Sequence, residues 1–251
     1  MLEVQDLSMR FGGLLAVDGV SLDVQNHEIV SVIGPNGAGK TTVFNCVSGF
    51  YKPTGGKILF EGKEVQGKPD YKISRLGMVR TFQHVRLFGQ MSVVENLLVA
   101  QHRHLNTNLL SGLLKTPDYR SREKRSLDKA AYWLERVGLL ELANREAGNL
   151  AYGQQRRLEI ARCMVTEPKL LMLDEPAAGL NPAETNDLNQ LIMSLKEDYN
   201  VSVLLIEHDM SLVMDISDRI TVINQGRPLA SGTPDDVRQN DEVIKAYLGE
   251  A

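Results

Sequence analysis

The sequence has little of what marks a disulfide-rich, membrane-spanning or strongly basic protein. Its 251 residues include two cysteines and one tryptophan, and the net charge is −4 at pH 7. Cys46 and Cys163 lie far apart and outside any metal-ligand spacing, so we expect two buried, reduced thiols. No apolar run reaches the roughly 18–20 residues that cross a bilayer, and Met1–Asp6 has no signal-peptide core. We therefore expect a soluble protein that works at a membrane only if other subunits hold it there.

The composition is that of a globular protein with a large core. Apolar residues make up 43% of the chain and charged residues 24%. The length suits one large domain or two small ones. Because the net charge is negative, the composition gives no electrostatic reason to expect a nucleic-acid partner.

The apolar pattern predicts strands toward both ends of the chain and helices in the middle. Two continuous apolar runs, Leu170–Leu173 and Val201–Ile206, are typical of parallel strands covered on both faces. A further strand that ends at a glycine is expected at Glu28–Ile33. Shorter strands are expected at Leu2–Gln5, Val20–Val24, Lys57–Phe60 and Arg219–Asn224. Helices are expected in Val43–Phe50, Leu127–Val137 and Gln155–Val165, with an irregular insertion at Leu105–Lys124 and a short helical tail from Pro234.

A glycine-rich motif between an expected strand and an expected helix predicts a phosphate-binding loop. The run Gly-Pro-Asn-Gly-Ala-Gly-Lys-Thr fits G-x-x-x-x-G-K-[ST] in full. Its backbone N–H groups can surround phosphates, and the helix start adds the positive end of its dipole. Lys40 is expected to reach the β- and γ-phosphates, and the Thr41 hydroxyl to bind magnesium. The predicted ATP-binding residues here are Gly34, Pro35, Asn36, Gly37, Ala38, Gly39, Lys40, Thr41 and Thr42.

Two carboxylates at the end of a later apolar strand complete this hypothesis. Asp174 and Glu175 follow the run Leu170–Leu173, and ligands bind at the carboxyl ends of strands in α/β sheets. Asp174 is expected to hold Mg²⁺ directly or through water, and Glu175 to act as the general base on the attacking water. An apolar run ending in Asp-Glu is often only a strand end, so the assignment depends on the phosphate loop.

Several further motifs resemble those of the ABC (ATP-binding cassette) ATPases. The segment Asn149–Arg157 reads Asn-Leu-Ala-Tyr-Gly-Gln-Gln-Arg-Arg and resembles the signature motif L-S-G-G-Q. Gln83 matches the glutamine of the Q-loop, and His208 matches the switch histidine. Ala178–Asn181 resembles the D-loop, and Phe11 takes the place of the aromatic that stacks on adenine. These motifs fall in the family's order, and the resemblance covers the whole chain.

The resemblance implies an α/β fold and a single ABC ATPase domain over residues 1–251. Such a domain has a P-loop NTPase (RecA-like) core, an N-terminal antiparallel β subdomain and an inserted α-helical subdomain. The core with its β subdomain would occupy residues 1–90 and 165–233, and the helical subdomain residues 91–164. A C-terminal tail would follow at residues 234–251.

The resemblance also implies a mechanism shared between two cassettes that pair head to tail. ATP would lie between the phosphate loop of one cassette and the signature motif of the other, so hydrolysis would depend on closure. The residues implied for binding the partner's nucleotide are Ala151, Tyr152, Gly153 and Gln154. Those implied for catalysis are Lys40, Gln83, Glu175 and His208, and those implied for the metal are Thr41, Gln83 and Asp174.

The signature motif departs from the family pattern at two positions. Ala151 stands where the serine is usual, and Tyr152 stands where the first glycine is usual. Alanine has no hydroxyl for the partner's γ-phosphate, whereas backbone donors such as Gly153 N–H remain. This departure fits a heterodimer with two unequal sites but does not establish one, and a homodimer in isolation stays possible.

Longer stretches resemble the ATPase subunits of bacterial branched-chain amino acid importers. These stretches are Met9–Val17, Arg80–Phe88, Asn96–Ala100, Leu150–Gln154 and Ala246–Gly249. That resemblance implies a second ATPase, two integral membrane permease subunits and, indirectly, a substrate-binding protein. It also implies import of leucine, isoleucine and valine, with this chain peripheral on the cytoplasmic face of the inner membrane.

Alternatives remain at this point. An ABC ATPase acting on nucleic acid or ribosomes usually has a long coiled coil or two cassettes in one chain, and neither is visible here. A stand-alone P-loop kinase conflicts with the signature motif and with His208. In the segment His84–Glu95, apolar residues fit either core under a loop or a groove for a permease helix. Leu109–Leu114 is a weaker candidate for membrane contact, and a metal site at His102 and His104 is disfavoured because no cysteine or carboxylate cluster accompanies them.

Overall fold

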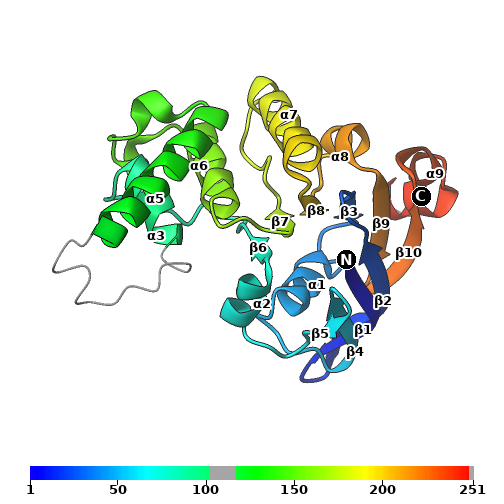
Figure 1. Ribbon diagram of the computed structural model, residues 1–251. Helices are drawn as coiled ribbons and strands as arrows, with labels where there is room; N and C mark the ends of the chain where they lie inside the picture. The colour runs from blue at the N-terminus through cyan, green and yellow to red at the C-terminus, as the bar shows by residue number, and fades with distance from the viewer. Residues whose placement is uncertain (102–116, 249–251) are drawn as a thin grey trace. The chain divides into compact units, whose positions relative to one another are not determined.

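The computed structural model describes residues 1–101 and 117–248 (Figure 1). These residues fall into two compact units: Met1–Gln83 with Lys169–Ala251, and His84–Pro168. The expectations for Leu109–Leu114 and for His102 and His104 lie outside the described residues.

The larger unit contains a six-stranded sheet with the order β10-β9-β3-β8-β7-β6. Its strands are β3 (Ile29–Ile33), β6 (Met78–Arg80), β7 (Leu170–Asp174), β8 (Ser202–Ile206), β9 (Arg219–Asn224) and β10 (Arg227–Gly232). All paired neighbours are parallel except β9 and β10. The continuous apolar runs are therefore parallel strands, as predicted.

Alternate side chains of this sheet face two different layers. Val32, Met172 and Leu204 join the core that contains Phe44 of helix α1 (Lys40–Val47). Figure 1 shows α7 (Pro182–Tyr199) and α8 (Met210–Ile216) on the other side of the sheet from α1. Both faces are thus covered, which explains why every residue of β3, β7 and β8 is buried.

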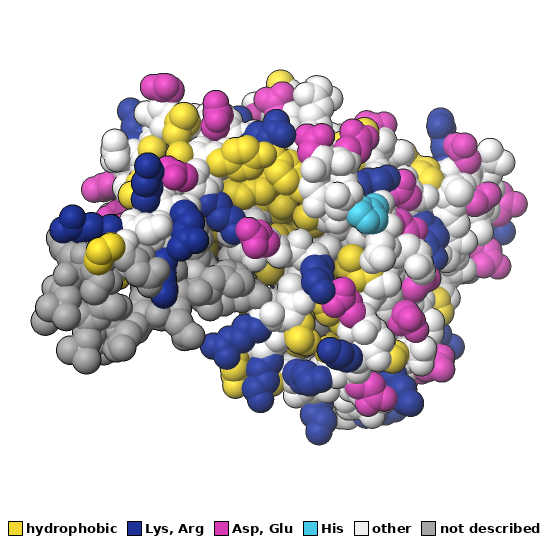
Figure 2. All heavy atoms as spheres, in the orientation of Figure 1, with side chains coloured by type: hydrophobic (Ala, Val, Ile, Leu, Met, Phe, Trp, Pro, Cys, Tyr) yellow, Lys and Arg dark blue, Asp and Glu magenta, His cyan; other side chains and the backbone are white. Residues whose placement is uncertain are grey.

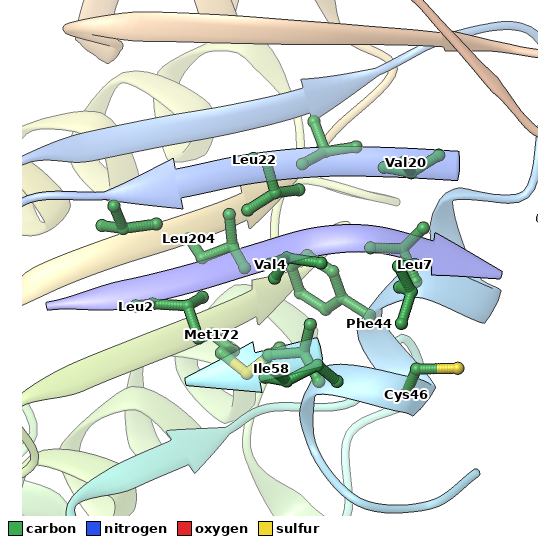
Figure 3. Close-up of a cluster of buried hydrophobic side chains, with 14 of the residues drawn as sticks. Leu2, Val4, Leu7, Val20, Leu22, Phe44, Cys46, Ile58, Met172 and Leu204 are labelled. Carbon is green, nitrogen blue, oxygen red and sulfur yellow. The ribbon is translucent and has the colours of Figure 1, made fainter. Parts of the chain in front are cut away.

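The same unit contains an antiparallel sheet with the order β2-β1-β4-β5. Its strands are β1 (Leu2–Phe11), β2 (Leu14–Val24), β4 (Gly55–Phe60) and β5 (Lys63–Glu64). Leu2, Val4 and Leu7 of β1 pack in one cluster with Phe44 (Figure 3). The expected N-terminal antiparallel sheet is confirmed, and its strands are longer than predicted because Gly12 and Gly13 form a tight hairpin turn between them.

The C-terminal tail is helical, as predicted, with α9 (Pro234–Arg238) and α10 (Asp241–Leu248). Val237 and Val243 from these helices share a second apolar cluster with Ile33, Ile220 and Val222. Ile33 is the last residue of β3. The tail therefore packs against the strand that leads into the glycine-rich loop.

The smaller unit is helical, with α3 (Val93–Gln101), α5 (Pro117–Arg136) and α6 (Tyr152–Met164). Short 3-10 turns lie at Leu140–Leu142 and Ala147–Asn149. The prediction of irregular chain up to Lys124 was wrong, because α5 already begins at Pro117. Proline suits the first position of a helix, where its missing N–H has no intrahelical partner.

Some elements had no sequence prediction. Helix α2 (Asp70–Leu76) was missed, as were strands β6 and β10. Strand β6 has three residues, and β10 contains Pro228, which weakens any strand prediction and is tolerated at a sheet edge.

The two cysteines are free and buried, as predicted. Burial raises the pKa of Cys46 to about 11 and that of Cys163 to about 12. Among the described residues, no helix combines the length and the apolar character needed to span a bilayer. On the face drawn in Figure 2, acidic and basic side chains are intermixed over the larger unit.

Candidate functional site

A pocket of about 440 Å³ opens at the carboxyl end of β3, where the chain turns into α1. Strand β3 lies between β8 and β9, and this edge is where ligands bind in α/β sheets. The volume falls in the range of small-molecule sites, roughly 300–1,000 Å³. The lining residues are Leu14, Leu15, Ala16, Asn36, Gly37, Ala38, Gly39, Lys40, Thr41, Thr42, Glu175, Gln225 and Gly226.

The glycine-rich loop has a backbone shape that only glycine permits at its first position. Gly34 has φ 151°, and a Cβ there would lie 1.9 Å from the carbonyl oxygen of Ile223. The Ala38 N–H donates to the carbonyl of Pro35 at 3.1 Å, which closes the turn. The close approach of Gly34 to the backbone of β9 and the bond between Ala38 and Pro35 therefore fix the turn of the loop.

Lys40 folds back onto this loop. Its Nζ donates to the carbonyl of Gly34 at 2.6 Å and to that of Pro35 at 3.0 Å. The residue is 7% exposed. Burial lowers the pKa of Lys40, and the negative charge of Glu175 partly opposes that shift. The ammonium group is thus held at the pocket wall, where it can exchange carbonyl partners for phosphate oxygens.

Helix α1 begins without a side-chain cap. Its N-cap residue is Gly39, which has no side-chain oxygen, so the first backbone N–H groups are not capped by a side chain. Thr41 and Thr42 stand in this first turn and line the pocket. Uncapped N–H groups beside a buried lysine are suited to a polyphosphate.

The two predicted carboxylates follow one another at the end of β7. Asp174 is the last residue of the strand, and its side chain is 4% exposed. Glu175 has φ 46°, a left-handed conformation that costs a non-glycine residue about 1 kcal/mol or more. Its N–H donates to the carbonyl of Ile206 at 2.9 Å, which holds it there. Glu175 lines the pocket, as the general-base hypothesis requires.

The structure brings Gln83 and His208 to Glu175. Gln83 Nε2 donates to Glu175 Oε2 at 3.0 Å. His208 Nδ1 lies 3.8 Å from the same oxygen, and the His208 side chain is 56% exposed. Two of the predicted catalytic side chains, Lys40 and Glu175, therefore line the pocket, and the other two, Gln83 and His208, lie beside Glu175.

Glu207 has a positioning role that sequence reasoning missed. It is fully buried, and its carboxylate accepts hydrogen bonds from the N–H groups of Ala177 and His208, at 2.8 and 2.9 Å. It thereby ties the segment after Glu175 to the segment that carries His208. The signal in the sequence was a carboxylate directly before the histidine.

Phe11 is a predicted nucleotide-binding residue that does not line the pocket, as is also true of Gly34 and Pro35 in the phosphate loop. The Phe11 side chain is exposed and makes an edge-on contact with Tyr51, with ring centroids 5.3 Å apart. It is not among the pocket-lining residues, where Leu14, Leu15 and Ala16 of β2 stand instead. These three residues were not predicted, because they carry no motif.

The signature segment belongs to the smaller unit, and the pocket of the larger unit is lined without it. Ala151 precedes α6, while Tyr152, Gly153 and Gln154 form its first turn. Gln154 Oε1 accepts a hydrogen bond from the Ala151 N–H at 3.1 Å. Ala151 offers no oxygen in return, so the first N–H groups of α6 lack a side-chain cap.

The donors near the phosphate loop fit magnesium. Thr41 and Asp174 offer hard oxygen ligands, and Mg²⁺ at nucleotide sites typically takes one or two protein oxygens together with phosphates and water. Among residues 1–101 and 117–248, no three His, Cys, Asp or Glu side chains gather as a protein-only metal site.

Comparison with known proteins agrees with this site. The ABC transporter family matches residues 17–178, and a family described as branched-chain amino acid ATP-binding cassette transporter matches residues 227–251. The high-affinity branched-chain amino acid transport ATP-binding protein BraF of Pseudomonas aeruginosa is 68% identical over 100% of this chain and 98% of its own length. The corresponding protein LivG of Escherichia coli K12 is 66% identical over the same shares.

A solved structure has the same fold. The crystal structure of the ADP conformation of an ATP-binding cassette of an ABC transporter superposes with a TM-score of 0.86 at 33% identity. The match covers 100% of this chain and 99% of that one. The chain therefore belongs to the ABC transporter family, within the group of branched-chain amino acid transport ATP-binding proteins, which are ATPases.

Proposed function

We propose that this chain binds Mg-ATP on its phosphate loop and hydrolyses it to energise the uptake of leucine, isoleucine and valine. The observation that carries the proposal is that Gln83 and His208 lie beside Glu175, which lines the same pocket as Lys40. The substrate class comes from the relatives' descriptions, which name branched-chain amino acid transport.

Each residue at the pocket has a role that its contacts support. Lys40 would leave the carbonyls of Gly34 and Pro35 and bind phosphate oxygens. Glu175 would orient the attacking water and accept its proton. Gln83 and His208 would fix the position of that carboxylate and of the water. Phosphoryl transfer depends mostly on such positioning and on charge neutralisation.

Thr41 and Asp174 would hold the magnesium ion, with Gln83 as a further ligand. The bound ion would neutralise negative charge on the β- and γ-phosphates. The buried Asp174 carboxylate and the first turn of α1 are the parts of the chain that would set its place.

We propose that a second cassette completes the site. Exposed Ala151 and Tyr152 at the start of α6 would face the γ-phosphate of the partner's nucleotide. Because Ala151 has no hydroxyl, the backbone N–H groups of that turn would supply the contacts. A signature motif with alanine in place of serine offers fewer donors than the usual motif, so the two sites of a pair would differ. This favours a heterodimer with a related ATPase, and a homodimer can form in isolation.

We further propose that the segment His84–Glu95 binds a short cytoplasmic helix of one of the two permease subunits, at the cytoplasmic face of the bacterial inner membrane. Phe88 and Met91 expose 49% and 39% of their surface. Buried Asn96 holds this segment, donating to the Phe88 carbonyl and accepting from the Phe88 N–H. A substrate-binding protein would then act through the permeases.

Backbone contacts within the smaller unit support a coupling role for this segment. The Gly148 N–H donates to the Gly89 carbonyl and the Ala147 N–H to the Met91 carbonyl, both at 2.9 Å. Gly148 lies three residues before Ala151. A force on the exposed segment would therefore reach the start of α6 through two hydrogen bonds.

A pull-down from detergent-solubilised membranes tests the proposal. The tagged chain should recover integral membrane subunits and a second ATPase, and the recovered complex should release phosphate from ATP. Recovery of ribosomes or DNA without membrane subunits would instead support the alternative, an ABC ATPase acting on nucleic acid.

A further inference from the structure

A buried arginine lies behind the nucleotide pocket. Arg80 is the last residue of β6, and its side chain is 7% exposed. Its guanidinium carbon lies 5.6, 5.6 and 5.5 Å from the ring centroids of Phe44, Phe50 and Phe82. Three aromatic faces around one guanidinium restrict its movement and add cation–π attraction.

The hydrogen bonds of Arg80 connect two elements that are distant in sequence. Nη1 donates to Asn45 Oδ1 at 2.7 Å and to Ser48 Oγ at 2.9 Å, both on or directly after α1. Nη2 donates to Asp174 Oδ2 at 2.5 Å. Because a guanidinium is planar and rigid, it fixes the distance between these partners.

The joined elements carry two of the three residues proposed to hold magnesium, Thr41 and Asp174. Asn45 lies four residues after Thr41, so both stand on the same face of α1. Asp174 is at the end of β7. In this hydrogen bond, Arg80 contacts only one of the two carboxylate oxygens of Asp174. The guanidinium therefore spans from the helix of Thr41 to the carboxylate of Asp174.

We propose that Arg80 is a positioning residue for magnesium: its guanidinium holds the Asp174 carboxylate at a fixed place relative to α1. This inference rests on the proposed Mg-ATP function. Phe82, whose ring contacts the guanidinium, precedes Gln83, so the same group also anchors the start of the segment that reaches Glu175.

Arg80 could instead serve only to neutralise the charge of Asp174, and the geometry of its hydrogen bonds separates that explanation from the positioning role. A carboxylate as buried as Asp174 needs a cationic partner, which either lysine or arginine supplies. Only arginine can bond Asn45 and Asp174 at once through separate nitrogens. A lysine at position 80 would keep the charge and lose the connection to α1.

The test measures ADP binding to the purified full chain by calorimetry, with Mg²⁺ titrated and with EDTA. For Arg80→Met, the Mg²⁺ concentration that half-restores tight ADP binding should rise about tenfold, the usual size of an effect behind metal ligands. Arg80→Lys should raise it about threefold, and ADP affinity in EDTA should stay within about twofold in both. Arg75→Met on α2 is the control, because the exposed Arg75 lies over the Tyr71 ring in a cation–π pair.

Asn45→Ala keeps Arg80 and removes its hydrogen bond to Asn45 on α1. This variant therefore tests the same inference if Arg80→Met fails to fold. It should raise the Mg²⁺ requirement about threefold. A wild-type Mg²⁺ requirement in Arg80→Lys or Asn45→Ala would overturn the positioning role. Equal losses with Mg²⁺ and with EDTA in Arg80→Met would also overturn it, because a merely structural residue predicts that result.

The failure of this inference is distinguishable from failure of the proposed function. If the wild-type chain bound ADP without any dependence on Mg²⁺, or if Lys40→Ala bound it normally, the Mg-ATP site itself would be wrong. If the wild-type chain showed Mg²⁺-dependent binding and Arg80→Met matched it, only the role of Arg80 would be wrong.

Discussion

The starts of helices α1 and α6 are alike in one respect and different in another. Both lack a side-chain cap, since Gly39 and Ala151 precede them. Helix α2, which follows Pro69, also lacks a side-chain cap, whereas α7 is capped by Asn181 and α8 by Asp209. A cap satisfies the first N–H groups of a helix, so its absence leaves donors for another acceptor.

The difference lies in what surrounds each start. At α1 the same unit supplies Lys40, a shaped loop and Glu175 around one pocket. At α6 the chain supplies exposed Ala151 and Tyr152. The comparison teaches that the chain carries one built nucleotide site and one exposed helix start, which is what a site shared with a partner requires.

The largest effect is expected from Glu175→Gln, which tests whether both helix starts act on one nucleotide. Removing the general base should slow ATP hydrolysis about 1,000-fold, while ATP binding is retained. The uncleaved ATP should then hold two cassettes together. Phosphate release and ATP-dependent size-exclusion chromatography measure the two results, with Glu197→Gln on the exposed face of α7 as control. Hydrolysis near the wild-type rate would remove Glu175 as the base.

Lys40→Ala tests the α1 side alone. Loss of charge-assisted hydrogen bonds to phosphate should weaken ADP binding about 100-fold, or about 2.7 kcal/mol. Lys63→Ala, on exposed β5, should bind normally in the same calorimetric titration. Because burial lowers the pKa of Lys40, wild-type affinity should also fall at alkaline pH before an exposed lysine would lose its proton. Unchanged affinity in Lys40→Ala would contradict the phosphate-loop assignment.

Substitutions at two glycines sharpen the claim that backbone contacts shape the α1 start. Gly34→Ala should lower the free energy of unfolding by about 3–5 kcal/mol, because the new Cβ would meet the Ile223 carbonyl. Gly37→Ala should cost only about 1–2 kcal/mol, from its left-handed backbone, since no atom lies within 4 Å of a Cβ there. Urea denaturation without nucleotide measures both. If the two substitutions lowered the free energy of unfolding equally, the chain must have moved to relieve the contact between the new Cβ at position 34 and the Ile223 carbonyl.

Ala151→Ser should have the smallest effect and tests the α6 side alone. A serine at this position can cap the helix and raise the free energy of unfolding by about 0.5–1 kcal/mol. ADP affinity at the chain's own loop should not change, and any change in hydrolysis should appear at the partner's site. Thermal unfolding and calorimetry of the isolated chain measure these quantities. A large change in ADP affinity would contradict an action in trans.

Sequence alone predicted the parts of the site that carry motifs or follow continuous apolar strands. The loop Gly34–Thr42, Glu175 and His208 stand where local pattern and strand ends indicate them. Arg80 could not be predicted as a partner of Asp174, because the two are 94 residues apart and meet only through the pairing of β6 with β7. The pocket wall at Leu14 and Leu15 was missed for a related reason: apolar residues on a strand carry no sign of what they face.

The roles of the predicted residues depend on features that the chain alone does not contain. Phe11 was predicted from its place in a motif, and its ring lies against Tyr51 instead of lining the pocket. Ala151 to Gln154 were predicted to act on a partner's nucleotide, which is a property of two chains. The magnesium ligands likewise need the phosphates to complete their coordination.

The apolar cluster shared by the tail and Ile33 has a practical consequence for anyone who alters the C-terminus. Val237 and Val243 support the last residue of β3, directly before Gly34. Truncations that remove α10 would therefore expose apolar surface beside Ile33, remove the Tyr247 contact to the Gly34 backbone, and weaken nucleotide binding. Affinity tags and fluorescent fusions should be added after residue 251 or at the N-terminus, with the tail left whole.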